Sequence, residues 1–403
     1  MKKSVIIIGG GPAGYHSALS CRDAGMEITL IEQHKIGGTC THNGCIPTRA
    51  YLSAIKARAQ LIKANPSAAS HVQLNLDELA QTTQQKINQL TFGMDYMLHR
   101  NKVTILNDTA TITGIRQVAL SDGTILTADH IIVATGSAAI VPQAHGFPNV
   151  FTVEELLTLQ NLPQEITIVG AGVLGIELAI ILQSLNCAVT LMEQESRILP
   201  DWDEDISAHI QAYLENLGIT VTLNADEIQG ANGVFCIGRK PNLPPIAAGI
   251  PLDATWLHII GDAAGGTMTA DAAITQGQQI ASTIANPEII QQIPLQAKCL
   301  FSPLEAASVG ETATKGDIVA YQDLGYTPSG ILFDTDLGMI KVVIDPDSHC
   351  LKGVHVVSHM ASELIQIAQI AVTQNMTAEV FCSMTFPHPT EGELLKEVVR
   401  SVL

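Results

Sequence analysis

Long apolar runs are missing from this sequence, although 46% of its 403 residues are hydrophobic. A membrane-spanning helix needs about 18 or more apolar residues in succession, and no uninterrupted stretch approaches that length. The short run at residues 5–8 follows two lysines and so resembles a signal start, but it leads directly into glycines without a cleavage-type site. We therefore interpret it as the first strand of a folded domain and expect no transmembrane segment.

Positive charge is also scarce. Lys and Arg number 21 against 39 Asp and Glu, which gives a formal net charge of −18. This charge opposes non-specific binding to nucleic acid or anionic lipid and favours basic protein partners. We expect neither nucleic acid nor membrane among the binding partners. The length exceeds one ordinary hydrophobic core and predicts about two to four domains.

Cysteines are few and mostly without pattern. Six of the eight are scattered: Cys21, Cys187, Cys236, Cys299, Cys350 and Cys382. That usage is typical of a reducing cytoplasm, where we expect the protein to be located. The other two, Cys40 and Cys45, are separated by four residues. Because no second pair has the spacing of metal ligands, a redox pair is a better interpretation than a metal site, and no metal is expected.

The chain begins with a complete dinucleotide-binding pattern. A strand at 5–8 leads into a glycine turn, a helix to about residue 24, and a second strand that ends at Glu32. Gly9 permits the tight turn, Gly11 lets the backbone approach a pyrophosphate, and Gly14 lets helix and strand pack closely. Glu32 is placed to accept hydrogen bonds from a ribose. Strand, turn, helix and terminal acid together make this a strong signal.

The same pattern recurs from residue 165. A strand at 165–169 precedes Gly170, Gly172 and Gly175, and the next strand leads to Glu193. The first glycine and the acid are 23 positions apart in both copies. The sequence therefore predicts two nucleotide sites. A carboxylate at Glu193 suits a free 2′-hydroxyl and repels a 2′-phosphate, so NAD is favoured over NADP.

The rest of the chain alternates helices and strands. Long helices are expected at 50–63 and 76–99, short strands between 103 and 127, and a buried strand at 131–133. Further elements are a strand at 257–260, a helix at 269–285, strands at 339–344 and 351–357, a helix at 361–373 and a final helix opening near residue 391.

These motifs, in this order, resemble the FAD- and NAD-dependent pyridine nucleotide-disulfide oxidoreductases of class I, and among them the dihydrolipoamide dehydrogenases. The resemblance covers nearly the whole chain. It rests on both glycine units, on 37–47 around the cysteines, on Ala134-Thr135-Gly136, on 238–242, on Gly261-Asp262, and on His388-Pro389-Thr390 with Glu393.

The resemblance implies an α/β fold with two Rossmann-like domains and a C-terminal α+β dimerisation domain. Their expected limits are 1–143 with 243–296 for FAD, 144–242 for a shortened NAD domain, and 297–403 for the third. Besides the first glycine unit, the FAD contacts implied are Gly38, Thr39, Thr135, Gly136 and Asp262. Arg239 is expected as an additional contact to NAD.

Catalytic roles also follow from the resemblance. Cys45 would lie against the flavin as a thiolate, while Cys40 would exchange with the substrate. His388 would take the proton, oriented by Glu393, and in this family the histidine comes from the other subunit. Glu177 would pair with Arg49 near the flavin ring. A homodimer is therefore expected.

The expected activity is oxidation of a dihydrolipoyl dithiol, free or on a lipoyl-bearing protein, with electrons passing to FAD and NAD. A 2-oxoacid dehydrogenase complex would be the larger partner. Alternatives are a related reductase for glutathione-like disulfides or mercuric ion, a pyridine-nucleotide transhydrogenase, and a non-catalytic flavin-bearing subunit.

Three departures from the family pattern bear on these expectations. Arginine stands at position 49, where lysine is usual, and 41–43 differ between the cysteines. The NAD domain is contracted between 221 and 235, and the chain again between 242 and 258. These contractions predict weaker binding of NAD.

Overall fold

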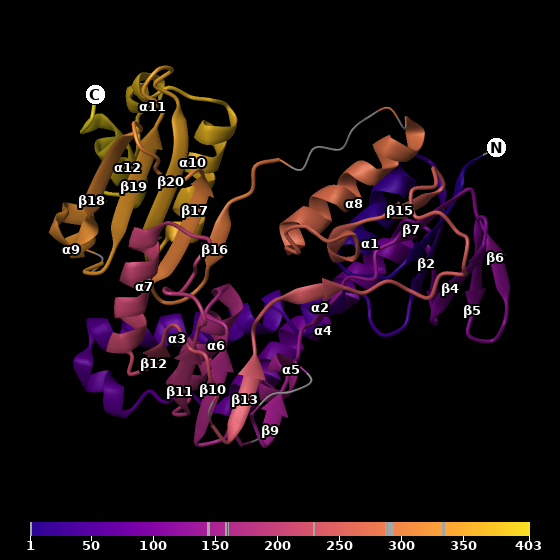
Figure 1. The fold of residues 1–403 in the computed structure, drawn as a ribbon, viewed down its shortest axis with the longest axis horizontal. Coiled ribbons are helices and arrows are strands. Elements are labelled where there is room, and N and C mark those ends of the chain that lie inside the picture. The colour runs from indigo at the N-terminus through magenta and orange to yellow at the C-terminus, as the bar shows by residue number, and fades with distance from the viewer. Residues whose placement is uncertain are drawn as a thin grey trace. The chain divides into compact units, whose positions relative to one another are not determined.

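The computed structural model describes residues 2–142, 146–157, 159, 161–228, 230–286, 288, 294–332 and 335–403. The chain divides into two compact units (Figure 1). The first comprises Met1–Thr48, Asp77–Val141 and Ile237–Ile293, and the second comprises Arg49–Leu76, Pro142–Cys236 and Pro294–Leu403. No helix in the described residues is long and apolar enough to cross a membrane. The three expected domain limits stay a prediction.

The first unit is built on a parallel five-stranded sheet of order β15-β7-β1-β2-β3. Its strands are β1 (Ser4–Ile8), β2 (Glu27–Glu32), β3 (Thr104–Asn107), β7 (His130–Val133) and β15 (Leu257–Ile259). One face packs against α1 (Pro12–Asp23), α8 (Ala270–Ala285) and the end of α4 (Leu76–Arg100). Val5, Ile7, Ile28 and Leu30 form the centre of that core.

The other face of this sheet is covered by a second, antiparallel sheet. Its strands are β4 (Ala110–Gly114), β5 (Gln117–Leu120) and β6 (Ile125–Thr127). Ile112 and Val118 pack there against Ile6, Ile8 and Ile31. Both faces of the first sheet are therefore buried in apolar contacts. A two-stranded ribbon of β8 (Ser137–Ala139) and β14 (Arg239–Pro241) completes the unit's strands.

The second unit repeats the parallel sheet with the order β12-β11-β10-β13-β9. The strands are β9 (Asn149–Phe151), β10 (Glu165–Val169), β11 (Ala188–Met192), β12 (Thr220–Thr222) and β13 (Asn232–Phe235). The helices that follow β10 and β11 are α6 (Val173–Ser184) and α7 (Glu204–Asn216), and α5 (Val153–Leu156) is a single turn. Only residues 223–231 separate β12 from β13, which confirms the expected direct passage between strands.

The C-terminal part of the second unit carries an antiparallel sheet of order β16-β17-β20-β19-β18. Its strands are β16 (Lys298–Leu300), β17 (Glu305–Gly310), β18 (Ile318–Asp323), β19 (Met339–Ile344) and β20 (Leu351–Ser358). The helices are α9 (Pro328–Leu332), α10 (Ala361–Thr373), α11 (Ala378–Ser383) and α12 (Glu391–Arg400). Leu364, Ile365, Leu394 and Leu395 anchor α10 and α12 to the common core.

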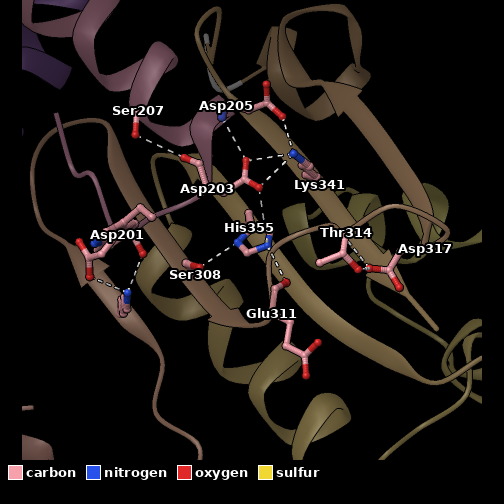
Figure 2. A network of polar contacts seen from close by, with 12 residues as sticks. Asp201, Asp203, Asp205, Ser207, Ser308, Glu311, Thr314, Asp317, Lys341 and His355 are labelled. Atoms are coloured by element: carbon pink, nitrogen blue, oxygen red, sulfur yellow. Dashed lines mark hydrogen bonds and ion pairs between the residues drawn. The ribbon is translucent and has the colours of Figure 1, made fainter. Parts of the chain in front are cut away.

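A buried polar network joins α7 to this C-terminal sheet (Figure 2). The Lys341 ammonium contacts Asp203 at 3.0 Å and Asp205 at 2.7 Å. Fully buried His355 is held between the Ser308 hydroxyl, 2.8 Å from Nδ1, and the Glu311 carbonyl, 3.1 Å from Nε2. Because Asp203 is also the N-cap of α7, this network fixes the start of that helix on the sheet.

One helix boundary differs from the expectation. The helix predicted from residue 50 begins at Cys45 and runs to Ala64 as α3, and residues 38–42 form a short helix, α2 (Gly38–His42). Pro47 lies in the first turn of α3, where a missing backbone N–H leaves no hydrogen bond unmade, so it does not delay the helix. The helix predicted at 76–99 is confirmed as α4.

Candidate redox active site

The first glycine turn has the close contacts that its sequence requires. Gly9 adopts φ +100°, and a Cβ added there would lie 2.4 Å from the Ala134 carbonyl oxygen. A Cβ on Gly14 would lie 1.8 Å from the Gly9 oxygen, so helix and strand meet with no room for a side chain. Gly11 caps α1, and its Cβ position touches only Gly38, at 3.8 Å. The open space before a helix N-terminus fits a dinucleotide pyrophosphate.

Glu32 holds the turn from the end of β2. Its Oε2 accepts a hydrogen bond from the Gly10 N–H at 2.6 Å, and its Oε1 accepts one from the His34 N–H at 2.8 Å. The carboxylate is therefore fixed beside the turn, in the position where ribose hydroxyls are bound in dinucleotide folds.

The second turn has the same construction. A Cβ on Gly175 would lie 1.9 Å from the Gly170 oxygen, and Gly172, which caps α6, has open space around it. Glu193 accepts hydrogen bonds from the N–H groups of Ala171 at 2.8 Å and Glu195 at 3.1 Å. In both units, a glutamate carboxylate is thus held beside the glycine turn by hydrogen bonds from two backbone N–H groups.

Arg197, the cation nearest to Glu193 in sequence, is hydrogen-bonded within its own loop and to the start of α7. Arg197 donates to the Trp202 carbonyl at 2.9 Å and to the Ser207 hydroxyl at 2.8 Å. A 2′-phosphate would need a free cation at this point, and Glu193 would repel it. The arrangement fits NAD.

The remaining predicted FAD contacts gather in the first unit. Gly38 adopts φ +57°, and its Cβ position lies 2.7 Å from the Gly11 Cα, so the two backbones meet closely. Thr39 follows in α2. The Thr135 hydroxyl donates to the Asn242 carbonyl at 2.5 Å, and Gly136 turns the chain with φ +74°.

Asp262 and Arg239 converge on a residue that the sequence did not single out. The Ser137 hydroxyl donates to Asp262 at 2.6 Å, and Arg239 donates to the hydroxyl of Ser137 at 2.7 Å and to its carbonyl at 2.8 Å. Arg239 therefore lies in the first unit, beside predicted FAD residues. Its contact to NAD stays a prediction. No motif marks Ser137, whose role is visible only in the fold.

Cys40 and Cys45 meet as two thiols. Cys40 lies in α2, Cys45 is the first residue of α3, and the two are joined by a hydrogen bond. The bond to Cys45 raises the pKa of Cys40, with burial as the second cause. The positive end of a helix stabilises a thiolate, and Cys45 is the residue at that end of α3. The separate roles that the resemblance implies for the two cysteines stay a prediction.

His388 and Glu393 form a preassembled dyad in the second unit. The Nδ1–H of His388 donates to Glu393 Oε2 at 2.8 Å. The imidazole is 74% exposed, whereas the carboxylate is 26% exposed. Thr390 caps α12 by accepting from the Glu393 N–H at 3.3 Å. The other ring nitrogen, Nε2, is thereby left as the accessible base.

Arg49 and Glu177 meet at Phe301. The guanidinium carbon of Arg49 lies 3.2 Å from the centre of the Phe301 ring, and buried Glu177 accepts the Phe301 N–H at 2.9 Å. The predicted direct pair of Arg49 with Glu177 stays a prediction. Phe301 carries no sequence signal, since an isolated phenylalanine is most often a core residue.

Comparisons with known proteins agree with this geometry. Residues 3–277 match the family model described as pyridine nucleotide-disulphide oxidoreductase, and residues 296–399 match its dimerisation domain. The latter match supports a homodimer.

Relatives named dihydrolipoyl dehydrogenase span almost the whole chain. That of Bacillus subtilis is 26% identical over 452 residues, covering 99% of this chain and 98% of the relative. That of Zymomonas mobilis is 28% identical over 450 residues, covering 98% and 97%. Both alignments are longer than this chain of 403 residues, so the relatives contain segments that it lacks.

Solved structures share the fold. LpdA from Mycobacterium tuberculosis has a TM-score of 0.86 at 22% identity, and the HOCl-induced flavoprotein disulfide reductase RclA from Escherichia coli has 0.86 at 21% in a Cu(II) complex. Each comparison covers 100% of both chains. The family uses FAD and NAD(H), for which both glycine turns described above are suited. The chain is a flavoprotein disulfide oxidoreductase and belongs to the pyridine nucleotide-disulphide oxidoreductase family.

Proposed function

We propose that this enzyme oxidises a dihydrolipoyl dithiol to its disulfide through Cys40 and Cys45, with NAD as the final acceptor. The observation that carries the proposal is the pairing of the Cys40 thiol in α2 with the Cys45 thiol at the N-terminus of α3. Relatives at 26–28% identity named dihydrolipoyl dehydrogenase support the choice of substrate.

The cysteines and the dyad divide the thiol chemistry between them. His388 Nε2 takes the proton of one substrate thiol, and the resulting thiolate attacks Cys40 Sγ in the Cys40–Cys45 disulfide. The S–S bond breaks and Cys45 leaves as a thiolate. The second substrate thiol then attacks the substrate sulfur of the mixed disulfide, which closes the product disulfide and releases Cys40 with a proton.

The electron pair gained by the cysteines must leave before another turnover. Bound FAD would supply the acceptor for that pair, and NAD would be the final hydride acceptor. The residues proposed to hold FAD are Gly9, Gly11, Gly14, Glu32, Gly38, Thr39, Thr135, Gly136 and Asp262. Those proposed for NAD are Gly170, Gly172, Gly175, Glu193 and Arg239.

The proposed assembly is a homodimer in the cytoplasm, in which His388 of one subunit serves the cysteines of the other. The proposed partner is a lipoyl-bearing protein, with a 2-oxoacid dehydrogenase complex as its setting. The net charge of −18 favours a basic docking segment on that partner.

The test is an anaerobic titration of the purified protein with NADH and, separately, with dihydrolipoamide, followed in the visible spectrum. Each donor is expected to produce a long-wavelength band from a Cys45 thiolate in contact with the flavin. Cys45→Ser should abolish the band. Cys40→Ser cannot form the disulfide, so it should show the band before any donor is added and give no further response to dihydrolipoamide. Cys382→Ser serves as the matched control.

Flavin without this band, and without turnover of any dithiol, would contradict the proposal in favour of a non-catalytic subunit. A substrate panel of oxidised glutathione, mercuric ion and NADPH distinguishes the related reductases and transhydrogenases. A related enzyme would turn over its own substrate from this panel faster than dihydrolipoamide.

A further inference from the structure

Ser137 links two residues of the proposed cofactor sites and has no role of its own in the proposed function. It is the first residue of β8 and follows Gly136, which turns the chain with φ +74°. Its hydroxyl donates to Asp262 Oδ2 at 2.6 Å, and Arg239 Nε donates to the same hydroxyl oxygen at 2.7 Å. One hydroxyl therefore lies between a guanidinium and a carboxylate.

The ribbon of β8 and β14 explains why Arg239 reaches Ser137. In its antiparallel register Arg239 pairs with Ala139, and Pro241 pairs with Ser137. Residues two positions apart in a strand point to the same face, so Ser137 is the diagonal neighbour of Arg239, within reach of a long side chain. A second bond, from Arg239 Nη2 to the Ser137 carbonyl at 2.8 Å, holds the guanidinium against this residue.

Asp262 reaches the ribbon from a different element, the short 3₁₀ helix η2 (Gly261–Ala264). Gly261 adopts φ +63°, and a Cβ added there would lie 2.9 Å from the Cβ of Ala13 in α1. The Gly261 N–H also donates to Gln276 Oε1 of α8 at 2.5 Å. The start of η2 is thus packed against the helix that follows the first glycine turn. Asp262 therefore lies in the part of the first unit that is proposed to hold FAD.

The chemistry of the three groups fixes the direction of both hydrogen bonds. A guanidinium only donates and a carboxylate only accepts, so the Ser137 hydroxyl accepts from Arg239 and gives its single proton to Asp262. Bonds to charged groups are the stronger ones, and each bond in such a series polarises the next. A carboxylate has about four acceptor positions on two oxygens, so Asp262 keeps Oδ1 for a further donor.

We propose that Ser137 is a positioning residue for FAD. It engages one oxygen of Asp262 and so fixes the carboxylate, whose other oxygen accepts from a hydroxyl of the cofactor. A carboxylate that is already fixed loses less rotational freedom when FAD binds, which strengthens binding. Arg239 supports Ser137 from β14 and keeps its third nitrogen, Nη1, for the contact to NAD proposed above. The inference rests on the proposed contact of Asp262 to FAD.

The experiment measures the dissociation constant of FAD from the purified flavin-loaded protein. The protein is diluted serially, and released FAD is followed by its fluorescence. Ser137→Ala and Ser137→Val remove the hydroxyl, Ser137→Thr keeps it, and Asp262→Ala removes its acceptor. Thr and Val have the same shape, so that pair isolates the hydroxyl even if the alanine variant does not fold. Ser121→Ala, at an exposed serine in the turn between β5 and β6, is the matched control.

We expect Ser137→Ala and Ser137→Val to raise the dissociation constant of FAD about ten-fold, as for one lost hydrogen bond to a charged group. Ser137→Thr and Ser121→Ala should stay near wild type. The double variant Ser137→Ala/Asp262→Ala should bind FAD no more weakly than Asp262→Ala alone, because Ser137 acts through that carboxylate. The affinity for NADH should be unchanged in every Ser137 variant.

Three results would overturn the inference. Wild-type affinity for FAD in Ser137→Val would show that the hydroxyl does not matter. Losses that multiply in the double variant would show that Ser137 acts independently of Asp262. Equal losses of FAD and NADH affinity in Ser137→Ala and Ser137→Val would indicate general damage to the fold.

These measurements also separate the inference from the proposed function. Normal FAD binding by Asp262→Ala would refute the proposed contact of Asp262 and the inference with it. No measurement in the series uses a dithiol. Failure of the wild type to oxidise dihydrolipoamide would therefore contradict the proposed substrate alone, and the role of Ser137 would stand on the FAD affinities.

Discussion

The two nucleotide-binding sheets of this protein share one plan at the glycine turn and differ on the face away from their helices. In the first, that face is sealed by β4, β5 and β6 over Ile6, Ile8 and Ile31. In the second, the positions matching Ile6 and Ile31 are Thr167 and Met192, and no described strand of the unit covers them.

This face, which no described strand covers, holds a cavity. Its volume is about 500 Å³, and its lining includes Thr167, Thr190 and Thr222, one from each of three neighbouring strands. Phe147 and Phe235 pack edge to face at 5.8 Å beside it. Thr167 is buried, whereas Thr190 and Thr222 are half-buried, so the cavity opens toward the β11 and β12 side of this face.

The difference teaches which part of the unit a dinucleotide requires. Glycine turn, helix N-terminus and terminal glutamate are present in both sheets, with the same bonds. The covering strands are not part of that set. They add buried apolar area, which stabilises the first unit.

The largest expected effects on cofactor binding come from substitution of the turn glycines. Gly14→Ala and Gly175→Ala each force a Cβ against a carbonyl oxygen at under 2 Å. Relief of such an overlap costs about 3 kcal/mol, or roughly 100-fold in affinity. We expect Gly14→Ala to lose FAD, and Gly175→Ala to keep FAD but lose reduction by NADH. Visible absorbance gives flavin content, and an NADH titration gives the second result.

A glycine without neighbours is the control for this pair. Gly93 lies in α4 with no atom within 4 Å of its Cβ position, so Gly93→Ala should keep both cofactors. Normal reduction of Gly175→Ala by NADH would show that the second turn does not hold a nucleotide.

Substitutions on the face covered by β4 to β6 and on the corresponding face of the second sheet should change the free energy of unfolding by different amounts. Ile6→Thr places a hydroxyl in the apolar layer under β4 to β6 and should cost about 2 kcal/mol of unfolding free energy. Thr190→Val, on the half-buried face of the second sheet, should stay within about 0.5 kcal/mol of wild type. Urea unfolding of each variant measures this, and equal losses would contradict the contrast.

The matched glutamates provide a smaller effect. Glu32→Gln removes the charge-assisted bond to Gly10, and Glu193→Gln removes the one to Ala171. Each should weaken binding of its own cofactor about ten-fold and leave the other unaffected. Dissociation constants of FAD and NADH test the pair, with Glu27→Gln, an exposed residue at the start of β2, as control. If either variant weakened binding of the other cofactor, the two sites would not be separate.

The smallest expected effect is one of pH on the first unit. His130 Nδ1 and His258 Nε2 are 3.1 Å apart, and burial lowers the pKa of both, that of His258 to about 4. Because folding lowers these values, the stability they contribute is present above the ordinary histidine pKa and is lost as pH falls. Flavin fluorescence should rise between about pH 6 and pH 4, as FAD is released.

Replacing His258 tests the source of this loss. His258→Gln cannot become charged, so flavin release on acidification should shift to lower pH. Lys3, Arg116 and Asp129 also act on this pair through His130, and they are unchanged in the variant. An identical release curve would locate the acid sensitivity elsewhere.

The sequence by itself determined both nucleotide units, the cysteine pair and the spacing of His388 and Glu393. These depend on contacts within a turn or a helix, which short patterns encode directly. The contraction between β12 and β13 was also readable, because chain length limits what a segment can form. The family assignment followed from the order of these local signals.

Only the tertiary structure decided how residues distant in the chain meet. It started α3 at Cys45 instead of residue 50, brought Arg49 and Glu177 to Phe301, and joined Arg239 and Asp262 through Ser137. It also buried Glu391 at the start of α12, although a glutamate at a helix start usually faces solvent. Burial depends on every element packed around a side chain, and no local pattern contains that information.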